Sequence, residues 1–135
     1  MRKVIFVITI VLFLISCNKK VVKIDLNLSR LNTEAIFKLD TINLNDWDSL
    51  YIVKPYNTDN LDRFNIPKPI LKEINSTVTT DGTCCLLFIK NDHLVNYSFV
   101  PQTVANFASK ELEDISILSS NQVYQLDEER SVTIP

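Results

Sequence analysis

Three cysteines and a single histidine are the side chains in this sequence best suited to nucleophilic, redox or metal chemistry: Cys17, Cys84, Cys85 and His93. One histidine is too few for the multi-histidine sites that hold catalytic zinc. His93 follows Asp92 and could act as a general base or a metal ligand, but a catalytic set also needs partners that only the fold brings together. A hairpin turn is expected here, so we favour a solvated polar residue.

Cys84 and Cys85 are neighbours in an apolar run. Adjacent residues of a strand point to opposite faces, so a bond between the two thiols would demand a strained local turn. A redox role needs an exposed thiol of low pKa, and the flanking residues 86–89 (LLFI) argue against exposure. We therefore predict two buried free thiols that pack as small hydrophobic side chains.

Composition excludes several other kinds of site. Acidic runs at 111–114 (ELED) and 127–129 (DEE) lack the alternating oxygen ligands and the glycine of a calcium-binding loop, so we interpret both as solvated. Gly82 is the only glycine, which leaves no Gly-rich phosphate loop or dinucleotide-binding turn. No basic stripe is present, so nucleic acid is not an expected partner. We predict no metal and no cofactor.

Aromatic residues edged by acids form the one candidate interaction patch. Trp47, the only tryptophan, and Asp48 are followed by Tyr51 and Tyr56. Tryptophan and tyrosine concentrate binding energy at protein interfaces, so these four residues could form a recognition surface. The alternative, which we favour, is that Trp47 covers the core where a strand begins.

The N-terminal segment has the layout of an export signal. Arg2 and Lys3 give a positive start, and Val4–Ile15 is a twelve-residue run in which Thr9 is the only polar residue. Twelve helical residues reach roughly 18 Å, well short of the roughly 30 Å hydrocarbon core of a bilayer. We therefore expect residues 1–16 to be a signal peptide that is removed.

Leu14-Ile15-Ser16-Cys17 resembles the lipobox of bacterial lipoproteins, with a branched residue three positions before the cysteine and a small residue directly before it. The resemblance implies that diacylglycerol is attached to the Cys17 thiol and that a peptidase cuts between Ser16 and Cys17. It also implies further acylation of the new amino group, with chains such as palmitate. Two or more chains would hold the protein stably on a membrane.

The residue after the cysteine bears on the destination. In Gram-negative lipoproteins an aspartate there commonly retains the protein at the inner membrane, whereas this sequence has Asn18. The resemblance therefore implies a lipid anchor in the outer membrane of a bacterial cell envelope, facing the periplasm. The alternative is an ordinary signal peptide with an incidental cysteine.

A second resemblance concerns the domain itself. The order Trp47-Asp48, Tyr51-Ile52 and Pro55-Tyr56, followed by a D-G turn and an apolar hairpin, is similar to small uncharacterised lipoproteins of Bacteroidota-like bacteria. The similarity covers about residues 46–100. That group implies no assigned activity.

Removal of residues 1–16 leaves 119 residues, enough for one domain. We expect a lipid anchor and tether over 17–30 and a single α+β domain over 31–135. Residues 84–90 (CCLLFIK) are apolar at every position but the last, which predicts a central strand covered on both faces. With residues 94–100 it should form a hairpin, at about 84–100, in a small antiparallel sheet of four to six strands.

Helices and a last hairpin complete the expected fold. Apolar residues at helical spacing predict a helix over about 103–117 that packs on one face of the sheet. Pro69 suits the first position of another short helix. Two short strands at 122–127 and 131–134 are expected to pair across a charged turn.

Three functions fit these observations. The first is a non-catalytic envelope protein that binds another protein or an envelope component from its lipid tether. The second is a lipid-anchored immunity or inhibitor protein that neutralises a toxin. The third is a hydrolase that uses His93. No recognisable catalytic set is present, so we expect the chain not to be an enzyme.

Overall fold

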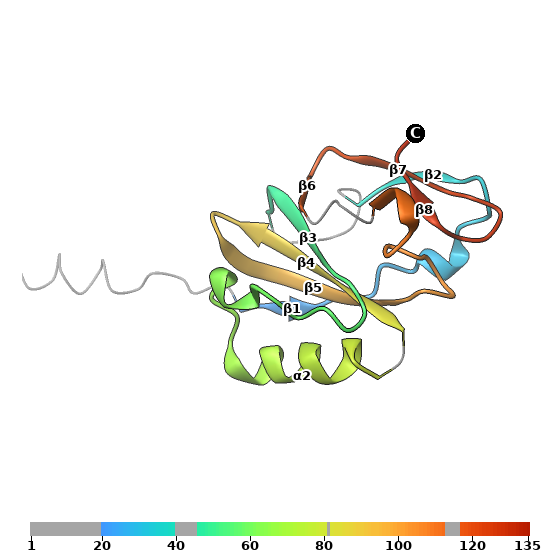
Figure 1. Cartoon of the computed structure of the whole chain (residues 1–135). Coiled ribbons are helices and arrows are strands. Elements are labelled where there is room, and N and C mark those ends of the chain that lie inside the picture. Colours follow the sequence, from blue (N-terminus) through green and yellow to red (C-terminus); the bar gives the residue numbers. More distant parts are fainter. Residues whose placement is uncertain (1–19, 40–45, 81, 113–116) are drawn as a thin grey trace, which may run out of the picture.

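The computed structural model describes residues 20–39, 46–80, 82–112 and 117–135. They form a mixed α+β fold with two β-sheets and, within those ranges, one α-helix (Figure 1). The strands are β1 (Val22–Lys23), β2 (Ile36–Lys38), β3 (Ser49–Val53), β4 (Thr83–Lys90), β5 (His93–Pro101), β6 (Ile117–Ser119), β7 (Val123–Leu126) and β8 (Val132–Thr133). The helix is α2 (Lys68–Val78), and single 3-10 turns lie at Leu28–Arg30, Leu61–Phe64 and Lys110–Leu112.

The larger sheet has five strands in the order β1-β5-β4-β3-β6. All its pairs are antiparallel except β1 with β5, which is parallel. β4 lies in the middle, and seven of its eight residues are buried. Alternate side chains enter two separate cores: Cys84, Leu86 and Phe88 enter one, and Cys85, Leu87 and Ile89 enter the other. The central strand is thus covered on both faces.

Helix α2 covers one face of this sheet (Figure 1). It begins after Pro67 and has Pro69 in its first turn, where the missing N–H of proline costs no hydrogen bond. Ile74 and Val78 are fully buried and pack with Leu87 of β4. We call this cluster the helix-side core.

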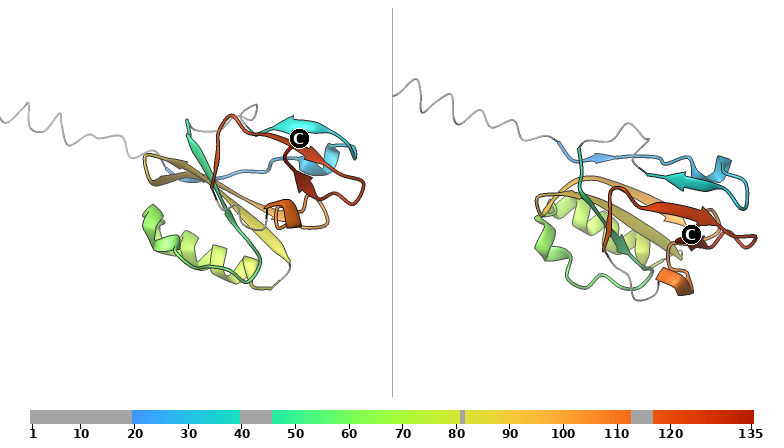
Figure 2. Two further views of the ribbon diagram at one scale, coloured as in Figure 1. Left: turned by 45° about the horizontal axis from the view of Figure 1, so that its top comes forward. Right: turned by 90° about the horizontal axis from the view of Figure 1, so that it is seen from above.

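The smaller sheet, in the order β2-β7-β8, lies over the opposite face and toward one end (Figure 2). Tyr124, Leu126 and Val132 point from it toward Leu86 and Phe88, and all five are almost fully buried. We call this cluster the sheet–sheet core. β7 and β8 pair antiparallel around the charged 127–131 turn, as expected for the last hairpin. A single sheet was expected, and the division into two sheets corrects that prediction.

The expected helix over 103–117 is wrong for the part of that range the structure describes. Residues 103–109 form turns on either side of an isolated β-bridge between Asn106 and Ser131, and the 3-10 turn Lys110–Leu112 follows. The reason is Asn106, whose backbone N–H donates to the carbonyl of Arg130 at 2.9 Å and whose carbonyl accepts from the N–H of Val132 at 3.1 Å. These groups would be needed inside a helix, and the Asn106 side chain also binds the N–H of Ala108 locally. The helix-like spacing of the apolar residues in 103–117 arises because Phe107 and Leu112 are buried in the core although their backbone forms turns.

The segment expected as a tether is partly built into the domain. β1 pairs with β5, and Leu26 and Leu28 are buried in the sheet–sheet core. The packed domain therefore begins near residue 22 rather than at residue 31. Residues 17–19 lie outside the described residues.

Candidate functional site

Ser16 and Cys17, the expected cleavage and lipidation residues, lie outside the described residues. The described chain starts at Lys20, which is exposed, and enters β1 two residues later. Among the described residues, no helix is long and apolar enough to cross a membrane.

The structure separates the four residues of the candidate aromatic patch. Trp47 is only 8% exposed and packs edge-on against Phe88, with ring centroids 5.0 Å apart. Tyr51 lies on the opposite face of the sheet, in the helix-side core, whereas Tyr56 is 71% exposed. Asp48 binds the backbone N–H of Asn91 at 3.2 Å. The residues therefore do not form one recognition surface, because the strand that follows Trp47 alternates between two cores.

Cys84 and Cys85 are both buried and both free. They point into different cores, which keeps the two thiols apart. Burial raises the pKa of Cys84 to about 11 and also raises that of Cys85. Because the thiolate is the reactive form, burial disfavours reaction at both thiols in the folded protein.

His93 is exposed at the first position of β5. Its Nδ1 lies 3.3 Å from the amide nitrogen of Asn65. No group of three or more histidine, cysteine, aspartate and glutamate side chains among the described residues could hold a metal ion. The surroundings of His93 are those of a solvated turn residue.

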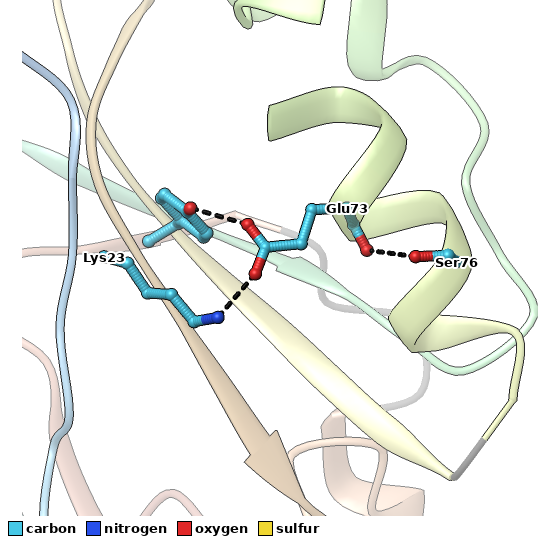
Figure 3. Close-up of polar contacts among 4 residues, drawn as sticks. Lys23, Glu73 and Ser76 are labelled. Atoms are coloured by element: carbon cyan, nitrogen blue, oxygen red, sulfur yellow. Dashed lines mark hydrogen bonds and ion pairs between the residues drawn. The ribbon is translucent and has the colours of Figure 1, made fainter. Parts of the chain in front are cut away.

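A polar cluster that the sequence did not indicate joins three elements (Figure 3). Glu73 of α2 reaches the edge of the sheet, where one carboxylate oxygen is 2.5 Å from the Nζ of Lys23 on β1. Its other oxygen accepts a hydrogen bond from the Tyr97 hydroxyl of β5 at 2.8 Å. The Nζ of Lys23 also lies 4.9 Å from the centre of the Phe99 ring. We call Lys23, Glu73 and Tyr97 the β1 latch.

In the β1 latch, the pKa values of Glu73 and Tyr97 shift in opposite directions. Hydrogen bonds from Lys23 and Tyr97 lower the pKa of Glu73. Burial, together with the neighbouring carboxylate, raises the pKa of Tyr97 to about 12. The ionised carboxylate and the protonated phenol are thus the forms that hold β1 to α2 and β5.

These shifts predict how the stability of the latch depends on pH. The pKa of Glu73 is lower in the folded state, so its contribution is present above its unfolded value of about 4.3 and is lost as pH falls below that value. The Tyr97 contribution is present below about pH 10 and is lost as pH rises through about 12. The backbone N–H of Ile24, next to Lys23, donates to the backbone carbonyl of Tyr97 at 2.9 Å. Its amide hydrogen exchange should therefore accelerate below pH 4 relative to the intrinsic rate. Glu73→Gln should remove that acid dependence, and an unchanged dependence would contradict the prediction.

Two open hollows flank the segment that follows β1. One, of about 340 Å³, lies between residues 23–29 and the end of β5 at Ser98–Pro101. The other, of about 420 Å³, lies between residues 26–31 and β2. Leu26, Asn27 and Leu28 contribute to both, so this segment forms the ridge between them.

Arg130 binds the backbone of the segment that follows β1. Its Nε donates to the carbonyl of Val104 at 2.5 Å, and its two terminal nitrogens donate to the carbonyls of Leu31 and Leu28 at 2.9 Å each. One planar guanidinium thus joins segments about a hundred residues apart in the chain. Nothing in the local sequence around Arg130 marks this role, because all three acceptors are backbone carbonyls.

Tyr124 is the one residue among those described with a buried side-chain oxygen that has no hydrogen-bond partner. Its ring packs on Phe37 and Phe107 in the sheet–sheet core. Burial raises the pKa of the hydroxyl well above its usual value.

Removal of that hydroxyl should not weaken the protein. An unpaired buried hydroxyl costs about 1–3 kcal/mol of desolvation, so Tyr124→Phe should leave the free energy of unfolding unchanged or raise it by about 1 kcal/mol. Urea unfolding followed by Trp47 fluorescence measures the change. A loss of 1 kcal/mol or more would show that the hydroxyl has a partner.

Comparisons of the chain with protein-family models, curated protein sequences and solved structures give no match. Function is therefore argued from the residues and their arrangement.

Proposed function

We propose that this protein is a lipid-anchored component of a bacterial cell envelope and that its domain is a non-catalytic binding module. The observation that carries the proposal is Leu14-Ile15-Ser16-Cys17 directly after a charged start and a twelve-residue apolar run. The lipid is attached at Cys17, and the anchor lies in the outer membrane with the domain in the periplasm.

The spacing between the anchor and the domain supports this proposal. β1 begins five residues after Cys17, and its pairing with β5 starts the packed structure at that point. A domain that begins so close to the lipidation residue would stay near the membrane surface. Such a position suits a protein that meets its partner at the membrane.

The surface around β2 is where we expect the partner to bind. β2 is an edge strand of the smaller sheet, and Ile36 on it is 65% exposed. The 420 Å³ hollow lies beside it and is lined by Phe37 and Val123 as well. The edge of a sheet can accept a strand of another chain, and an adjacent apolar hollow accepts the side chains of that strand.

Two measurements in the native envelope test the proposal. The mass of the N-terminal peptide should begin at Cys17 and include the acyl chains, and a bare Cys17 thiol would refute the anchor. A photo-crosslinking residue at Ile36 should give a discrete adduct whose partner is identified by mass spectrometry. The same residue at Tyr56, which is similarly exposed, is the matched control. Equal adducts from both positions, or none from Ile36, would contradict the β2 surface.

A further inference from the structure

The first strand determines how the domain sits on the membrane. We infer that β1, held on the sheet by the β1 latch, orients the domain on the membrane. The β4–β5 turn then faces the phospholipid surface, and the three-stranded sheet lies away from it. This inference rests on the proposed lipidation of Cys17. It goes beyond the anchor in naming the membrane-facing end of the domain and the contact whose loss would free the domain to reorient.

The register of β1 gives the direction. β1 runs parallel to β5, and Val22 lies opposite Asn96, three residues after β5 begins at His93. The chain before Val22 therefore leaves the sheet at the end that carries the β4–β5 turn (Figure 1). Val22 is the fifth residue after Cys17, and five residues at about 3.3–3.6 Å each span at most roughly 18 Å.

The length of the sheet makes that short link directional. β5 has nine residues, which extend over roughly 30 Å. The turn between β7 and β8 lies at the other end of the molecule from the β4–β5 turn (Figures 1 and 2). Because the link is shorter than the sheet, the β4–β5 turn stays near the bilayer and the β7–β8 turn is on average farther from it.

β1 itself is weakly held, so the orientation can be released. β1 has only two residues, both paired with β5, and Val22 is 45% exposed. The side chains of Lys23 and Glu73 are 52% and 37% exposed, so their ion pair adds only modestly to the few contacts that hold this two-residue strand, and repulsion in its place is enough to detach it. If β1 detaches, the first residue after Cys17 that is still packed in the domain is Leu26, which is buried in the sheet–sheet core. The link then has nine residues and spans up to roughly 30 Å, which is as long as the sheet.

Fluorescence quenching from the bilayer surface tests the orientation. The purified lipoprotein is labelled at a cysteine introduced by His93→Cys or Glu128→Cys, both at exposed positions near opposite ends. Cys84 and Cys85 are buried and stay unlabelled in the folded protein. In phosphatidylcholine–phosphatidylglycerol vesicles with a headgroup-attached quencher, the label at 93 should be quenched at least twofold more than the label at 128. Equal quenching, or stronger quenching at 128, would overturn the inference.

Charge reversal tests the β1 latch. Lys23→Glu places two acids together, so it should bring the quenching ratio close to one. Exchange of the charges, Lys23→Glu with Glu73→Lys, should restore the wild-type ratio. Lys110→Glu makes the same charge change on an exposed residue outside the latch and should leave the ratio unaltered. A ratio that Lys23→Glu leaves unchanged would show that β1 does not depend on the latch.

Flotation of the vesicles separates the two proposals. Protein that fails to float with the vesicles and lacks a lipid mass on its N-terminal peptide would refute the anchor, and the orientation with it. Protein that floats but shows equal quenching at 93 and 128 would refute the orientation alone.

Discussion

Replacement of Cys17 by alanine should leave a precursor that is neither cut nor lipidated. Alanine has no sulfur to carry the diacylglycerol that the lipobox resemblance implies. Each buried methylene contributes about 0.8 kcal/mol to membrane binding, so loss of all the chains should remove essentially all lipid-dependent attachment. Intact mass measurement should show a product that starts at residue 1, and a fatty-acid analogue added during growth should not label it.

A matched cysteine change gives the control for this experiment. Cys84→Ala alters a buried thiol of the sheet–sheet core and should leave cleavage and lipid labelling as in the wild type. The lipoprotein proposal fails if Cys17→Ala is still cut at the same place and sits in the membrane as the wild type does. It also fails if both variants take up the same lipid label.

Arg130→Ala should lower the free energy of unfolding by about 2–4 kcal/mol. Hydrogen bonds to charged groups contribute about 1.5–3 kcal/mol each, and the three made by Arg130 share one side chain, so their contributions do not add fully. The substitution also removes a donor from the part-buried carbonyls of Leu28 and Leu31, of which the Leu28 carbonyl keeps the N–H of Leu31. Urea unfolding followed by the fluorescence of Trp47, which is buried against Phe88, measures the loss.

Three controls separate the guanidinium from other effects. Arg63→Ala removes an exposed arginine whose contacts are with aromatic rings, and it should cost less than 1 kcal/mol. Arg130→Lys keeps the charge but cannot reach three acceptors in one plane, so it should recover less than half of the loss. The Arg130→Gly variant should be about 1 kcal/mol more stable than the Arg130→Ala variant, because φ at this position is 63° and glycine adopts this left-handed conformation without the steric cost of a Cβ. A loss below 1 kcal/mol for Arg130→Ala would contradict the role of the three bonds.

Local patterns predicted several elements of the fold. The run 84–90 is apolar on both faces, and β4 indeed lies in the middle of the larger sheet between two cores. Pro69 marked the first turn of α2, because proline there loses no hydrogen bond. The charged turn at 127–130 joins β7 and β8, as the two flanking short apolar runs indicated.

Other patterns were misleading because burial, not secondary structure, produced them. The apolar spacing of 103–117 is that of a helix, yet Phe107 and Leu112 are buried from turns whose backbone is bonded to the C-terminal hairpin. Trp47 and Tyr51 are close in sequence but point into different cores. Tyr51 lies in β3, whereas Trp47 precedes the strand. The alternation of a strand does not extend to a residue before it, so the four-residue interval does not predict that both side chains lie on one face.

The sequence by itself is the basis of the proposed lipid anchor near the start of the chain. The proposed signal is a cysteine after a short apolar run, with a small residue before it. Such a signal is linear and requires no folded partner, so the proposal could be made without the tertiary structure. The apolar character of both faces of β4 is likewise local, since successive residues of a strand point to opposite faces and each shows whether its face is buried.

Only the tertiary structure decided which distant groups meet. The acceptors of Arg130 lie 26 to 102 residues away and are backbone carbonyls, which every residue type provides. Lys23 and Glu73 are fifty residues apart, and nothing in either neighbourhood distinguishes them from other charged residues. The physical reason is that chain packing, not side-chain identity, brings these donors and acceptors within hydrogen-bonding distance.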